Sequence, residues 1–187
     1  ALFTDKGAKW AGNSYELYFR CHNSMDIMSF AIPGIYIADS TSLNLNITPE
    51  GIMTTELKSP RIAYREQYMK GVNVAIDNRN NKITGELNCN EIRAASMMLM
   101  DSRFQILAED NHLGAAFSYE NTGELLNRGE FVLVSDFDRK DEKLDIDLKL
   151  LPTSLHLNSR EWNIQPSKIH ISGKDIDVES LELTSAE

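Results

Sequence analysis

Apolar and polar residues alternate with a period of two along most of this chain. The clearest run is residues 144–150, where four apolar residues are separated by Asp145, Asp147 and Lys149. Because successive side chains of a β-strand point to opposite faces, such a run predicts a strand with one apolar and one polar face. Similar runs recur from Tyr15 to Leu183. The spacing predicts an all-β chain of about a dozen or more short strands.

Glycine, proline and asparagine mark the expected turns between these runs. The turns are predicted at Pro33 and Gly34, residues 48–51, Ser59 and Pro60, residues 77–81, residues 121–123, residues 138–143, Pro152, Pro166 and Ser167, and Gly173 and Lys174. Helix is expected at few places. Residues 90–100 are mostly good helix formers, and Asn90 could cap a helix there. Their apolar residues lie on too many sides for an amphipathic helix, so a short helix and a pair of strands both stay open. Residues 24–30 are a weaker helix candidate.

The apolar face of an alternating sheet must be removed from water. An elongated, curved antiparallel sheet of the half-pipe type achieves this with an apolar concave face, and a β-sandwich achieves it by packing two sheets together. We predict the half-pipe and keep the β-sandwich as the alternative. The length of 187 residues suits one domain, so residues 1–187 are expected to form a single β domain.

The formal net charge of −9 excludes several classes of partner. A phosphate backbone would repel such a chain, so nucleic-acid binding is not expected, and electrostatic adhesion to an anionic membrane is disfavoured for the same reason. The sequence contains no stretch of about 18 apolar residues that would span a membrane. It shows no signal peptide and does not begin with Met, so we expect it to be a segment of a longer protein.

The sequence contains no recognisable catalytic motif, and we expect a protein that is not an enzyme and has no cofactor or metal site. His156 and His170 each stand between two apolar residues, which predicts that they lie on the polar faces of their strands. Asp145 and Asp147 are likewise expected to lie on the polar face of their strand rather than to form an acidic site. Cys21 and Cys89 form no metal-binding pair, and two free, half-buried cysteines at strand positions are favoured over a disulfide.

Three methionines, Met97, Met98 and Met100, form a cluster in the sequence. Filling of the core is the favoured interpretation. A soft surface that adapts to varied apolar ligands is the alternative.

The last third of the chain resembles the TamB/AsmA-like family in the form found in Bacteroidetes. The resembling elements are a strand with Trp162 and Ile164, the turn at Pro166 and Ser167, a strand with Ile169 and Ile171, and a closing Leu181 and Leu183. Residues 57–64, 71–74 and 77–81 are also similar to this family. The resemblance covers most of residues 43–183, whereas residues 1–40 fit it less distinctly.

The resemblance implies a segment of a long periplasmic β protein whose full-length form is anchored in the inner membrane. Such a protein shields lipid acyl chains for transport to the outer membrane or supports assembly of outer-membrane proteins. The implied partners are a phospholipid or other acyl-chain ligand and, through parts outside this segment, a BamA-like outer-membrane barrel protein. The alternative is a β-sandwich binding or adhesion module of a secreted or cell-surface protein.

The apolar positions of the alternating runs are the candidate lipid-lining residues. They are Leu43, Leu45, Ile47, Val72, Val74, Ile76, Ile83, Leu87, Leu144, Ile146, Leu148, Leu150, Ile164, Ile169, Ile171, Ile176 and Val178.

Overall fold

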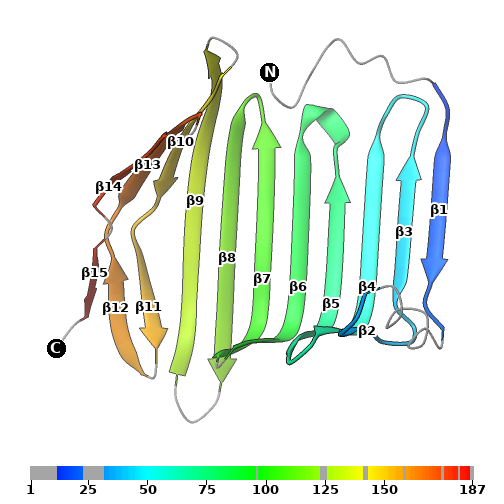
Figure 1. The fold of residues 1–187 in the computed structure, drawn as a ribbon, viewed down its shortest axis with the longest axis horizontal. Coiled ribbons are helices and arrows are strands. Elements are labelled where there is room, and N and C mark those ends of the chain that lie inside the picture. Colours follow the sequence, from blue (N-terminus) through cyan, green and yellow to red (C-terminus); the bar gives the residue numbers. More distant parts are fainter. Residues whose placement is uncertain are drawn as a thin grey trace.

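The structure, a computed structural model, describes residues 12–22, 32–95, 97–122, 126–140, 143–157, 159–173, 175–180 and 182–185. Within these residues, fifteen strands form one open antiparallel sheet, with one short 3₁₀ helix, η1 (Arg79–Asn81), between two of them (Figure 1). The strands are β1 (Tyr15–Arg20), β2 (Ile35–Ile37), β3 (Ser42–Ile47), β4 (Met53–Tyr64), β5 (Gln67–Asp77), β6 (Ile83–Ala94), β7 (Met97–Glu109), β8 (His112–Thr122), β9 (Leu126–Lys140), β10 (Lys143–Leu150), β11 (Thr153–Leu157), β12 (Arg160–Ile164), β13 (Ser167–Ser172), β14 (Asp175–Glu179) and β15 (Leu183–Ser185).

The order of the strands follows the order of the chain over most of the sheet. Strand β1 pairs with β3, and from β3 to β10 each strand pairs with the next one, while β2 adds to the lower end of β4. The prediction of an all-β chain is confirmed, and the open sheet is consistent with the predicted half-pipe. The alternative of two packed sheets is wrong for the part of the chain that the structure describes, because all of its strands belong to one sheet.

Beyond β9 the sheet divides into two branches. The upper half of β9 pairs with β10, which continues to β13 and β14, and the lower half pairs with β11, which continues to β12 and β15 (Figure 1). Pro152 separates β10 from β11, and Pro166 separates β12 from β13. Proline has no backbone N–H to donate to a neighbouring strand, so it interrupts a sheet ladder. The predicted breaks at these two prolines are confirmed.

The pairing register divides the side chains of the main sheet between two faces, because residues directly opposite each other share a face. We call the two surfaces the apolar face and the polar face. In one cross-strand row, Leu45 lies opposite Leu17 and Thr55, and Thr55 lies opposite Ile76. In the next row, Asn44 lies opposite Tyr18 and Glu56. The alternation in the sequence is therefore carried through the sheet from strand to strand.

The sheet bends along a line that crosses β4 to β7. The regular pairing is interrupted at Pro60, Gly71, Asn90 and Asp101, and the φ angles of Gly71 (60°) and Asp101 (42°) are positive. A Cβ on Gly71 would lie 2.5 Å from Nδ2 of the Asn90 side chain, and the positive φ of Gly71 also favours glycine at this position. Figure 1 shows the strands turning near their lower ends.

Small side chains occupy the inner side of this bend. They are nearly inaccessible to solvent, with exposures of 2–4%, and they are Cys21, Thr41, Ser59, Val72, Cys89 and Ser102. The hydroxyl groups of Thr41 and Ser59 are hydrogen-bonded at 2.6 Å. Because these side chains are small, their larger neighbours enclose them, and they are among the most buried residues of the apolar face.

The short strand β2 and the ends of four strands beyond the bend form what we call the lower segment. It comprises residues 35–37, 61–64, 67–70, 91–94 and 97–100. One of its faces is apolar apart from Gln67. It includes one cross-strand row formed by Ile62, Met69, Ile92 and Leu99. The other face carries aromatic and charged residues. Their arrangement is described below.

Several features differ from the sequence-based expectations. Residues 121 and 122 were expected in a turn, but they pair with β9. Ser59 and Pro60 lie within β4 rather than in a turn between strands. Pro60 is tolerated there because the pairing of β4 with β5 is interrupted at Pro60 and Gly71. Residues 138–140 and 143 belong to the paired strands β9 and β10 rather than to the predicted turn, and residues 141 and 142 lie outside the described residues. Residues 91–94 and 97–100 form the paired ends of β6 and β7, so the strand-pair interpretation is correct for these residues.

Residues 24–30, the weaker helix candidate, lie outside the described residues. Among the residues described, no helix is long and apolar enough to cross a membrane.

Candidate functional site

The strand register places all seventeen candidate lipid-lining residues on the apolar face. In the C-terminal part, Ile146 lies opposite Phe137 and Ile171, and Ile171 lies opposite Ile176. In the central part, Val74 lies opposite Leu57 and Leu87. The sheet therefore places on one face positions that are more than a hundred residues apart in the sequence. Their role in lining a lipid site stays a prediction.

The apolar face is half-buried in its centre and exposed at both edges. Leu57, Val74 and Leu148 are half-buried by their neighbours in the same layer. At one edge, Leu17 of β1 is 52% exposed, and at the other edge Ile176 of β14 is 64% exposed. In the part of the chain that the structure describes, no second layer of strands or helices covers this face. An apolar surface of this extent is uncommon on a soluble monomer and indicates a binding surface.

Aromatic side chains occupy the middle of the apolar face. The rings of Phe117 and Tyr119 have centroids 6.0 Å apart, and those of Phe117 and Phe131 have centroids 6.4 Å apart. Tyr119 is 6% exposed, and its burial raises the pKa of its hydroxyl. Next to it, a Cβ on Gly129 would lie 2.9 Å from Cε1 of Tyr119, so the tyrosine ring lies directly over the glycine. The aromatic rings make a rigid central part of an otherwise aliphatic surface.

The polar face carries a row of ionisable side chains across β8, β9, β10, β13 and β14. In this row His112, Asp136, Asp147, His170 and Asp177 lie directly opposite one another. Nδ1 of His112 lies 2.5 Å from Oδ1 of Asp136, and Nδ1 of His170 lies 2.8 Å from Oδ1 of Asp147. The hydrogen bond to Asp147, supported by the negative charges around it, raises the pKa of His170. Two histidines and three aspartates therefore lie in one cross-strand row on the polar face.

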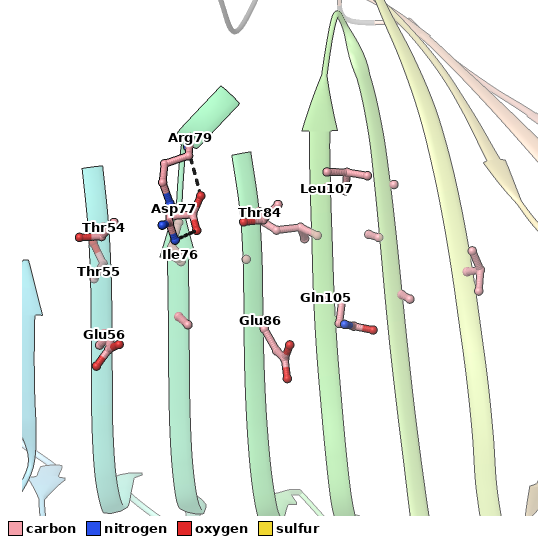
Figure 2. Close-up of a pocket in the computed structure, with 17 residues that line it drawn as sticks. Thr54, Thr55, Glu56, Ile76, Asp77, Arg79, Thr84, Glu86, Gln105 and Leu107 are labelled. Carbon is pink, nitrogen blue, oxygen red and sulfur yellow. Dashed lines mark hydrogen bonds and ion pairs between the residues drawn. The ribbon is translucent and has the colours of Figure 1, made fainter. Parts of the chain in front are cut away.

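A hollow of about 770 Å³ also lies on the polar face, between β4 and β9 (Figure 2). It exists because Ala75, Gly114 and Ala116 are small. The charged groups at its margin already have partners. Arg79 forms an ion pair with Asp77 at 2.8 Å, as Figure 2 shows, and Glu86 binds Arg103 at 3.1 Å. Of the seventeen candidate residues, only Ile76 contributes to this hollow.

The lower segment contains a cluster that the sequence did not suggest. The guanidinium of Arg61 lies 5.7 Å from the ring centroid of Tyr36 and 4.8 Å from that of Tyr68. Glu91 accepts hydrogen bonds from Tyr68 and, at 2.7 Å, from Nζ of Lys70, and the bond from Lys70 lowers the pKa of Glu91. These residues come from four strands, β2, β4, β5 and β6, and only the register of the strands shows that they meet.

The cysteines and methionines bear on two further expectations. Cys21 and Cys89 are free, as favoured from the sequence, and buried. They lie at the same level of the sheet four strand spacings apart, about 19 Å, which is too far for a disulfide. Met97 is 60% exposed and Met98 is 46% exposed, so the interpretation of the methionine cluster as core filling is wrong for these two. Within the described residues, no cluster of ligating side chains could hold a metal ion.

Comparison of the chain with protein-family models, with curated proteins and with solved structures finds no match.

Proposed function

We propose that this chain is a non-enzymatic lipid-shielding segment, whose apolar face holds acyl chains away from water. The supporting observation is the apolar face itself, which continues from β1 to β14 with no covering layer in the described residues. A surface of this kind gains free energy from any apolar ligand laid against it, at about 25 cal/mol per Å² of apolar area buried. Without such a ligand, the exposed apolar side chains stay in contact with water and this free energy is not gained.

The proposed mechanism is passive. Hydrophobic burial has no preferred direction, so an acyl chain on aliphatic side chains can move along the face without breaking specific bonds. The edges, where Leu17 and Ile176 are exposed, leave the surface open to ligands. The polar face supplies the charged surface that keeps the sheet in solution.

The resemblance to the TamB/AsmA-like family supports a more specific form of this proposal. In that form the chain is a segment of an envelope-spanning periplasmic protein, anchored in the inner membrane, that transfers phospholipid toward the outer membrane or supports outer-membrane protein assembly. A BamA-like barrel protein would be the partner, through parts outside this segment.

Arginine on the apolar face is the direct test. We expect Ile146→Arg and Leu148→Arg to abolish binding of a fluorescent phospholipid while the chain still folds, because a long side chain at a half-buried position can bring its charge to water. Asn73→Arg, on the polar face, is the matched control and should bind like the unmodified chain. Circular dichroism checks folding, and native mass spectrometry of the purified protein checks for co-purified lipid.

Two results would contradict the proposal. One is unchanged phospholipid binding by well-folded Ile146→Arg and Leu148→Arg proteins. The other is the absence of any phospholipid binding by the unmodified chain.

A further inference from the structure

The lower end of the sheet differs in charge from the rest of the molecule. Residues 61–70 and 91–98 contain four cationic side chains, Arg61, Arg65, Lys70 and Arg93, against the two acidic side chains Glu66 and Glu91. The chain as a whole has a net charge of −9. The excess of negative charge therefore lies elsewhere, and this end is locally positive.

The strand pairing brings these residues to one rim. The β4–β5 connection and the β6–β7 connection lie at the same end of four neighbouring strands, about 10 Å apart at two strand spacings. Along the last row of the lower segment, Tyr64 lies opposite Ile35 and Gln67, and Ala94 lies opposite Met97. Figure 1 shows both turns at the bottom of the view.

Large apolar side chains are exposed at this rim. Tyr64 is 47% exposed, Met97 60% and Met98 46%. Met97 and Met98 are adjacent in β7, so they point to opposite faces and both project from the end of the hairpin. Exposure of these side chains to water costs free energy. They do not pack in a hydrophobic core, so the stability of the fold does not explain their exposure.

Cationic groups lie next to these apolar side chains. The guanidinium of Arg65 lies 5.2 Å from the ring centroid of Tyr64, and Arg93 lies opposite Met98. Two rows further from the rim than Arg93, Arg61 is held over the rings of Tyr36 and Tyr68. Tyrosine is favoured at the interface between lipid and water, and cationic side chains there bind lipid phosphates.

We infer that this rim docks on the surface of an anionic lipid bilayer, with Met97 and Met98 inserted between the lipids and the arginines against the phosphates. The surface of an anionic membrane offers both an apolar interior and a layer of negative charge. It therefore matches both the exposed apolar side chains and the positive charge of the rim. The net charge of the whole chain opposes adhesion through any other part of the surface. The rim is distinct from the apolar face of the main sheet, and the inference stands independently of the proposed function.

Vesicle binding tests the inference. The unmodified chain should co-sediment with vesicles of phosphatidylglycerol and phosphatidylethanolamine, and bind at least tenfold more weakly to vesicles of phosphatidylcholine alone or at high salt. Met97→Asp should weaken binding to the anionic vesicles at least tenfold, and so should the double variant Arg65→Glu with Arg93→Glu. All of these side chains are exposed, so the variants should fold normally, and circular dichroism checks that they do.

Leu107→Asp is the matched control. Leu107 is 46% exposed, like Met98, but it lies near the other end of β7 and on the polar face. This variant should bind the vesicles as the unmodified chain does. The inference is overturned if the unmodified chain ignores anionic vesicles, if Met97→Asp and Leu107→Asp bind equally, or if the rim only pairs two copies of the chain, as a dimer in solution that Met97→Asp converts to monomer without any vesicle binding.

Discussion

The two faces of the main sheet are built from the same strands but respond to different forces. On the apolar face, neighbouring side chains crowd together, and residues such as Val72 and Ala108 are 2% and 3% exposed. On the polar face, the neighbouring positions carry charged pairs such as Lys58 with Glu56, at 3.9 Å, with both side chains more than 60% exposed. Since adjacent residues of a strand alternate between the faces, each apolar-face position has its own control one residue away.

The largest expected effect separates the two faces at the bend. Val72→Asp would place a carboxylate where the side chain is 2% exposed, and we expect the free energy of unfolding to fall by about 3 kcal/mol or more. Asn73→Asp, one residue along, is exposed and lies opposite Lys58, so it should change stability by less than about 0.5 kcal/mol. Urea denaturation measures both. Equal effects would mean that the two faces are not distinct at this level of the sheet.

A smaller effect is expected from two glycines within the strands. A Cβ on Gly85, on the apolar face, would lie 2.6 Å from Cγ1 of Ile106, so Gly85→Ala should destabilise the chain by about 1–2 kcal/mol. A Cβ on Gly114, on the polar face, would lie no closer than 3.9 Å to its nearest neighbour, the carbonyl oxygen of Leu107. Gly114→Ala should therefore be neutral or stabilising by about 0.5 kcal/mol. Thermal unfolding measures the stability of both variants. If Gly85→Ala were no less stable than Gly114→Ala, the apolar face would be loosely packed at Gly85 and the prediction would be wrong.

The smallest effect concerns the polar face alone. The hydrogen bond between His170 and Asp147 raises the pKa of His170, so the contribution of this contact to stability is present below the unfolded pKa, about 6.5, and is lost as the pH rises through the higher folded pKa. Asp147→Asn should bring the pKa of His170 back toward its usual value, as an NMR titration of the imidazole would show. A titration of His170 that is the same in both proteins would rule out this coupling.

The apolar face was predictable from the sequence because alternation is a local property. Leu148 and Leu150 are separated by one residue in the chain and on the strand alike, so their shared face follows without knowledge of the fold. The set of seventeen residues shares a face because the register keeps every apolar run in phase with its neighbours.

The bend and the lower segment were not predictable in the same way. Pro60 was expected to lie in a turn, but it lies within β4 because the paired positions on β5 and β6 deviate at the same level. Residues 90–100 have helix-forming composition, yet pairing of Ile92 with Leu99 determines their structure. The contacts among Tyr36, Arg61 and Tyr68 depend on pairing between three strands, which no pattern within one strand encodes.

The near-sequential strand order has a consequence for how such a sheet is made. From β3 to β10, each strand finds its partner in the segment synthesised just before it, so the loops that must close are short and contact order is low. The sheet could then assemble hairpin by hairpin as the chain emerges. For the same reason, duplication of a hairpin would lengthen the sheet without changing the pairing of the other strands, which gives evolution a simple way to set its span.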